Sequence, residues 1–203
     1  MNLAAYQAAI SVPAKELINM GSLQVPTGQL VACDPFMCAG SAPFTRRVPP
    51  GTYAVRLRRT DLQEAGWRIA LAMLIIDPDE PAVSIEEAEL EQGGADGYFV
   101  DSGLGALMDE AARAQLSAVL AAFFRAEPKG NYYDDVLAAE FKHSADDPGD
   151  PDDIGQWNMH SLPGTRLNVA MFASGMGDGA YRSYWALGKD GKPVALVTDF
   201  GIL

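Results

Sequence analysis

The sequence predicts an α+β fold: a mainly antiparallel β-sheet or β-sandwich with two or three helices and a helical insertion in the middle of the chain. Three observations support it. Strand-like stretches separated by turn signals fill the first half, helical patterns follow, and about fifty C-terminal residues return to strands. For 203 residues without internal repeats we expect a single domain over 1–203, with an N-terminal helical segment (1–20), a helical insertion (109–145) and an acidic loop (146–153).

The first expected elements are a short helix and two strands. Ser11 can cap a helix that runs to Gly21. Turns rich in glycine and proline precede an apolar strand over 30–33 and a second strand over 52–58. Apolar and polar residues alternate in the second strand. We therefore expect its arginines to face outward and three of its side chains to face inward, namely Tyr53, Val55 and Leu57.

Three further strands are expected before the helices. The stretch 68–76 is too apolar to be half exposed and predicts a central strand that is covered on both faces. Residues 83–90 alternate less clearly and carry three glutamates, which leaves an edge strand or a short helix open. Residues 97–103 predict a strand that ends in a glycine-bearing turn.

Two helices and a C-terminal hairpin complete the expected fold. Asp109 is placed to cap a helix over 110–126, whose apolar side chains recur on one face, and Asn131 is placed to cap a second helix over 132–143. A strand over 167–173 and a hairpin of 181–187 with 194–200 follow.

Composition excludes several classes of partner. With 15 basic and 27 acidic side chains the net charge is −12, whereas nucleic acids and anionic membranes require clustered Lys and Arg. The longest apolar run, residues 69–76, is far shorter than the ~20 residues of a membrane span. The first residues lack the features of a secretory signal. We therefore expect a cytoplasmic protein that binds neither nucleic acid nor membrane.

The residue types most often used in catalysis do not form a recognisable catalytic motif. Cys33 and Cys38 have no second cysteine pair to complete a zinc site, so we interpret them as one buried small residue and one loop thiol. No serine stands in the nucleophile motif of hydrolases. His143 is expected at a helix end and His160 in a loop. The glycine-rich stretch 174–179 precedes a strand rather than a helix, which argues against a phosphate site.

Short blocks recur in an informative order along the chain. They stand at 26–36, 48–53, 68–74, 100–103, 108–109, 174–179 and 196–200, together with Tyr181, Tyr184 and Trp185. In this order they resemble the bacterial family catalogued as domain of unknown function 4241, over about residues 21–200. Phe99 stands where members of that family commonly have glycine. The resemblance implies no activity, because the family name records none.

Most of these blocks bring an aspartate next to a glycine, a proline or a strand end. Such an aspartate is typical of a tight turn in which its carboxylate accepts backbone N–H bonds. If several converge at one end of the sheet, they could instead bind Ca²⁺ or Mg²⁺ through oxygen ligands, or two of them could form an acid–base pair. The spacing does not separate these cases, and the candidate ligand or metal pocket comprises Asp34, Asp101, Asp109, Asp178 and Asp199.

Charges are segregated along the sequence. Six of the fifteen cations lie between Arg46 and Arg68, whereas residues 77–110 carry eleven acids and no cation, and residues 134–153 carry eight acids against Lys142. This pattern is typical of a solvated acidic face or of a surface that captures a basic partner protein. The candidate partner-binding residues are Glu86, Glu87, Glu89 and Glu91.

Two functions therefore remain open. The first is a non-catalytic interaction protein, of the immunity or adaptor type, whose acidic surface binds a basic toxin or effector. The second is a metal-dependent enzyme or small-ligand-binding module that uses aspartates at one end of the sheet.

Overall fold

The protein has an α+β fold with two antiparallel sheets, in a computed structural model that describes residues 1–93 and 97–203. In spatial order the larger sheet contains β1 (Leu17–Val25), β3 (Gly51–Asp61), β4 (Trp67–Ile75), β11 (Pro193–Asp199), β10 (Gly179–Leu187) and β5 (Ser84–Glu87), and β6 (Tyr98–Val100) also pairs with β10. The smaller sheet contains β2 (Leu30–Cys33), β7 (Leu104–Asp109), β9 (Asn168–Ala173) and β8 (Trp157–Ser161).

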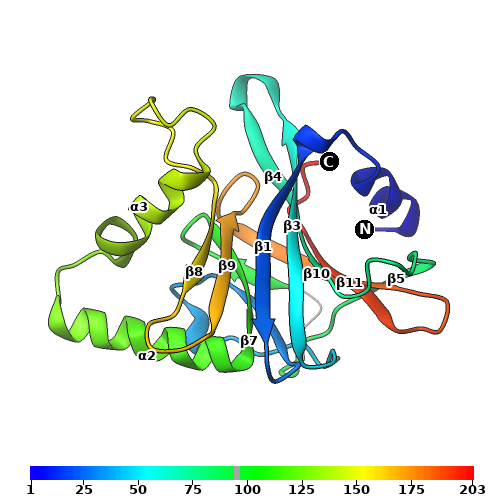
Figure 1. The fold of residues 1–203 in the computed structure, drawn as a ribbon, viewed down its shortest axis with the longest axis horizontal. Helices are drawn as coiled ribbons and strands as arrows, with labels where there is room; N and C mark the ends of the chain where they lie inside the picture. Colours follow the sequence, from blue (N-terminus) through cyan, green and yellow to red (C-terminus); the bar gives the residue numbers. More distant parts are fainter. Residues whose placement is uncertain (94–96) are drawn as a thin grey trace.

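The two sheets pack face to face, and their inner faces form the main hydrophobic core (Figure 1). Leu57 and Leu74 from the larger sheet and Leu107 and Phe172 from the smaller sheet are completely buried there. Burial of such side chains supplies about 1.5–3 kcal/mol each. The alternation expected for residues 52–58 is confirmed for Val55 and Leu57.

Helices cover the outer face of each sheet, on opposite sides of the sandwich (Figure 1). On the larger sheet, Tyr6 and Ala9 of α1 (Leu3–Ile10) pack with Leu71 and Met73. On the smaller sheet the cover consists of α2 (Glu110–Ala126), a π-helical turn (Tyr133–Leu137), α3 (Ala138–Phe141) and a 3-10 turn (Lys142–Ser144).

Several expected elements are confirmed, and the open choice for residues 83–90 is settled. β4 lies between β3 and β11 and is buried on both faces, and β5 is an edge strand rather than a helix. Asp109 caps α2, since its carboxylate accepts the N–H of Ala111 at 2.8 Å. β10 and β11 form the expected C-terminal hairpin.

The expected helix over 11–21 is wrong. Asn2 caps the helix that forms instead, α1, which ends at Ile10. Residues 17–25 form the strand β1, because Leu23 and Val25 bury their side chains in the core and the backbone pairs with β3. A bulge near Gly21 shifts the register of that pairing.

Two expectations about burial are also wrong. Arg58 does not face outward: the register shifts after it, and its buried guanidinium forms an ion pair with Glu16 at 2.7 Å. Cys38 is not a loop thiol in solvent but is buried in a 3-10 turn beside Ser117. Burial raises the pKa of the Cys33 and Cys38 thiols, which keeps both protonated at neutral pH.

Candidate functional site

Three of the candidate aspartates lie around one turn, residues 101–103, between β6 and β7. Asp34, at the end of β2, is 1% exposed. Its carboxylate accepts the N–H groups of Phe36, Asp101 and Ser102 at 2.8, 3.0 and 2.9 Å. The carboxylate therefore fixes two turns that are 67 residues apart in sequence.

Asp178 binds the same turn from a third segment. Its carboxylate accepts the N–H of Gly103 at 3.0 Å, and the carbonyl of Gly103 accepts the N–H of Ser174 at 3.0 Å. Gly103 has φ of +69°, which favours glycine. The Ser174 hydroxyl donates to the carbonyl of Gly177. These hydrogen bonds link the three loops to one another.

The other two aspartates make separate contacts. Asp109 stands at the opposite end of β7, where its carboxylate also accepts the N–H and hydroxyl of Thr27 at 3.0 and 2.8 Å. Asp199 ends β11 and accepts the N–H of Gly201. Among the described residues, no three His, Cys, Asp or Glu side chains are grouped so that they could hold a metal ion. These contacts bring Asp34, Asp101 and Asp178 together at one turn and leave Asp109 at the other end of β7.

The candidate glutamates are partly neutralised by the chain itself. Glu86 forms an ion pair with Arg46, and Glu87 forms one with Arg182 at 3.5 Å. Glu91 accepts a hydrogen bond from Gln29. Residues 94–96, within the acidic stretch, lie outside the described residues. The charges that are segregated along the sequence therefore meet in space at this surface.

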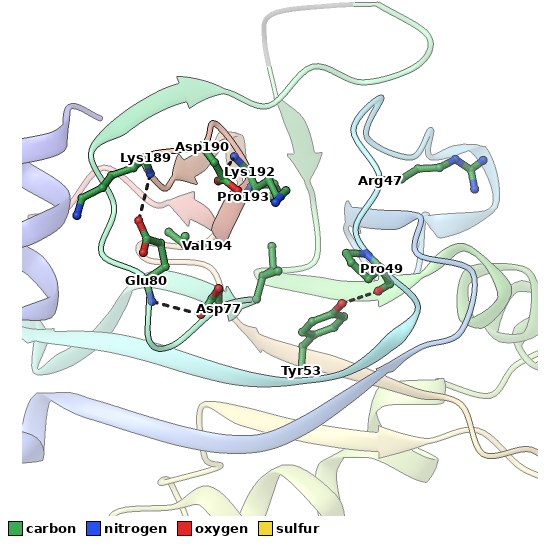
Figure 2. A pocket seen from close by; sticks show the side chains of 11 residues that line it. Arg47, Pro49, Tyr53, Asp77, Glu80, Lys189, Asp190, Lys192, Pro193 and Val194 are labelled. Atoms are coloured by element: carbon green, nitrogen blue, oxygen red, sulfur yellow. Dashed lines mark hydrogen bonds and ion pairs between the residues drawn. The ribbon is translucent and has the colours of Figure 1, made fainter.

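A polar groove of about 630 Å³ lies where the β10–β11 turn meets the segment after β4 (Figure 2). Its charged groups are engaged locally: Glu80 accepts the N–H of Lys189, and Lys192 pairs with Asp190 at 2.6 Å. Arg47 points away from the other residues that Figure 2 labels and binds Gln29. The groove is a surface of mixed charge.

A larger cavity, which we call the aromatic cavity, has a volume of about 770 Å³ and opens beside the helices on the smaller sheet. It contains no charged side chain. Phe124 and Ile154 at its wall are 45% and 56% exposed, although both are large and apolar. The lining residues are Phe36, Ser102, Gly103, Leu104, Phe124, Gly130, Asn131, Tyr132, Tyr133, Phe141, Ile154, Gly155 and Ala173.

The walls of the aromatic cavity are held by local contacts. The Asn131 side chain accepts the N–H of Tyr133 at 3.0 Å and begins the helical turn, as expected for a cap. Gly155 has φ of +79°, and a Cβ there would lie 1.9 Å from the carbonyl oxygen of Phe141. Only glycine allows the 154–155 segment to approach α3 this closely.

A buried hydrogen-bond chain next to the aromatic cavity was not expected from the sequence. His160 lies in β8 and is 3% exposed, so the loop predicted for it is wrong. Its Nδ1 is 2.8 Å from Glu140 of α3, and its Nε2 is 3.2 Å from the Tyr132 hydroxyl. Burial, assisted by Glu140, raises the pKa of Tyr132, so its hydroxyl stays neutral. The chain ties the helices to the sheet.

Comparisons with known proteins identify a family but no activity. No curated protein and no solved structure matches the chain. None of the helices that the structure describes has the length and apolar character of a transmembrane span. One family model matches residues 23–198, most of the chain, under the description "Protein of unknown function (DUF4241)". The chain belongs to this family, whose name assigns no function.

Proposed function

We propose that the protein is a non-catalytic interaction protein, of the immunity or adaptor type, that binds a basic protein partner through an acidic surface. The proposal rests on the placement of the surplus negative charge. The observation that carries it is the loop 146–153, which exposes carboxylates on a backbone that is already ordered.

The carboxylates of this acidic loop hold its own backbone. Asp147 accepts the N–H of Gly149, Asp150 accepts that of Asp152, and Asp153 accepts the N–H groups of Asp147 and Gly155. These bonds lie at 2.9–3.1 Å. A loop that is ordered before binding loses little conformational entropy when a partner arrives.

Few cations of the chain compensate the acidic loop. Arg59 binds Asp146 through both carboxylate oxygens at 2.8 Å. The Lys142 amine donates to the backbone carbonyls of Asp150 and Asp153 rather than to their carboxylates. Among the described residues, the carboxylates of the acidic loop other than Asp146 form no ion pair, so their charge would attract a cationic partner through long-range steering.

The surface with Glu86, Glu87, Glu89 and Glu91 is a second proposed contact. Glu89 is exposed, and among the described residues its side chain has no charged partner. A partner's cations would have to replace Arg46 and Arg182 at Glu86 and Glu87. We expect this surface to contribute less than the acidic loop.

The test is cross-linked capture from an extract of the source organism, followed by binding measurements with the purified partner. We expect a partner of net positive charge that is released at about 0.5 M salt, because screening weakens exposed charge pairs. A loop-reversal variant (Asp147→Lys, Asp150→Lys, Asp152→Lys) should lose binding. A glutamate-reversal variant (Glu86→Lys, Glu89→Lys, Glu91→Lys) should weaken it.

The matched control changes the charge equally at exposed acids elsewhere, with Asp61→Lys, Glu64→Lys and Asp79→Lys. This variant should bind the partner almost as well as the unaltered protein. A partner of net negative charge, or equal loss of binding in the control and the loop-reversal variant, would contradict the proposal.

The alternative is a metal-dependent enzyme or a ligand-binding module at the aspartates. The measurement that separates it is a thermal melt in EDTA, Ca²⁺ or Mg²⁺, because a ligand that binds only the folded state raises the melting temperature. A rise of several degrees with either cation would favour this alternative. An unchanged melt, together with loss of partner capture in the loop-reversal variant, favours the interaction function.

A further inference from the structure

The aromatic cavity exposes apolar surface that the fold leaves uncovered. Phe123 packs edge-to-face against Tyr132 at 5.1 Å between ring centroids, whereas its neighbour Phe124 remains 45% exposed at the wall. Ile154 is also exposed there. Apolar surface in water costs about 25 cal/mol per Å² relative to burial. A partner group that covers both side chains would recover this free energy.

The cavity's chemistry selects an apolar occupant. Its lining has no charged side chain, and two of its polar side chains are already engaged. The Asn131 side chain holds the helical turn, and the Tyr132 hydroxyl binds His160. A charged group in this cavity would lose its hydration without gaining a partner. The volume of about 770 Å³ lies in the range of sites that bind small molecules.

The sequence positions next to the lining carry charges of both signs. Asp152 and Asp153 directly precede Ile154, and Asp134 directly follows Tyr133. Arg125 directly follows Phe124, and Lys129 directly precedes Gly130. The surplus of negative charge lies next to Ile154, where the acidic loop ends.

We propose that the aromatic cavity binds one large aromatic or branched aliphatic side chain of the basic partner, from a segment in which Lys or Arg flanks that side chain. The apolar group covers Phe124 and Ile154, and the flanking cation pairs with the acidic loop. This inference rests on the proposed function and names the chemistry of the partner segment.

A second copy of the chain is a poorer occupant. Each molecule carries a net charge of −12, and a copy seated here would bring its own negative charge near the acidic loop. Like charges at such a contact oppose association. A basic segment provides charge complementarity and apolar contact together.

The test is selection of displayed random dodecapeptides on the intact protein, with counter-selection on the Phe124→Asp variant. Enriched peptides should carry a large apolar residue within three positions of Lys or Arg. Their affinity, measured by fluorescence anisotropy, should fall about tenfold or more for Phe124→Asp and for Ile154→Asp, as for an anchor in a buried contact. The matched control, Val83→Asp, changes an exposed apolar residue distant in sequence from the cavity and should leave affinity unchanged.

Other outcomes overturn the inference. Peptides without cations, peptides that bind the two cavity variants as tightly as the unaltered protein, or no enrichment would each do so. A naphthalene sulfonate dye that binds in the cavity while no peptide does would reassign the cavity to a small apolar ligand. If the natural partner binds Phe124→Asp normally but loses the loop-reversal variant, the inference fails and the proposed function stands. If the selected peptides bind at the cavity but the natural partner is not basic, the proposed function fails, and the preference of the cavity for an apolar side chain flanked by a cation remains.

Discussion

The two outer faces of the sandwich carry different kinds of cavity. Beside α1, a space of about 380 Å³ is lined partly by charged residues, including Arg56, Asp77 and Glu80. Beside α2 and α3, the aromatic cavity is about twice as large and has no charged lining residue. Water solvates charged walls at no cost, whereas it solvates apolar walls poorly. The apolar surface that would gain most from a partner therefore lies on the side of α2 and α3.

The largest difference in stability is expected between two phenylalanines of the helices that cover the smaller sheet. Phe141 is 1% exposed in the core of this side, whereas Phe124 lies at the cavity wall. Phe141→Ala should lower the free energy of unfolding by about 3–5 kcal/mol. Phe124→Ala should change it by no more than about 0.5 kcal/mol. Urea unfolding measures both, and similar losses would mean that Phe124 is structural.

The caps of α2 and α1 are expected to differ in how much each stabilises the fold. Asp109→Ala removes the cap of α2 and the two hydrogen bonds that its carboxylate accepts from Thr27, which should cost about 2–4 kcal/mol. Asn2→Ala removes a single cap bond at α1 and should cost about 1 kcal/mol. Chemical denaturation, with hydrogen exchange to locate the loosened helix, tests the order. Equal costs would contradict it.

The buried chain of Glu140, His160 and Tyr132 predicts a smaller effect. Tyr132→Phe keeps the ring but removes the hydroxyl that bonds to His160, and should lower the free energy of unfolding by about 1 kcal/mol. Tyr133→Phe is the control and should be nearly neutral. Denaturant unfolding of both variants decides whether this chain stabilises the helices on the smaller sheet.

The smallest effect is expected at the acidic loop. The N–H of Asp147, followed by that of Gly155, donates to the Asp153 carboxylate and holds its pKa below the ordinary value of 3.8. A lowered folded-state pKa stabilises the ionised form. The contribution is therefore present at neutral pH and is lost as the pH falls through that lowered value.

Carbon-detected NMR titration of Asp153, with amide exchange at Asp147, should show the loop loosening only below about pH 4. Asp153→Asn should abolish this transition. Loosening that begins near pH 6 would show that another group orders the loop.

The sequence predicted those helices and strands whose caps and apolar patterns lie within a few neighbouring residues. The cap at Asp109 and the apolar periodicity of residues 110–126 sufficed for α2, and the apolar run near residues 68–76 sufficed for β4. By contrast, β8 was missed because Asn158 and His160 are polar yet face a helix. Both bind Glu140, 18 and 20 residues away in sequence. Such strands depend on partners that a local pattern does not contain.

The candidate sites depend even more on distant contacts. The sequence placed aspartates at turns, but which N–H groups they bind is set by contacts such as that of Asp34 with residues 101–102. The aromatic cavity forms between segments that include Phe36, Gly103, Phe124 and Ile154. Its shape depends on how α2 and the 154–155 segment pack, which no local periodicity encodes.

The position of the C-terminal hairpin has a consequence for synthesis of the protein. β11 and β10 stand between β4 and β5 in the larger sheet, so β4 has no neighbour on that side until residues 179–199 leave the ribosome. Until then, one of the most apolar strands of the chain presents a free edge to other nascent chains. Productive folding should therefore wait until β11 has been synthesised, and a chain that stalls or is truncated before β11 should aggregate through β4.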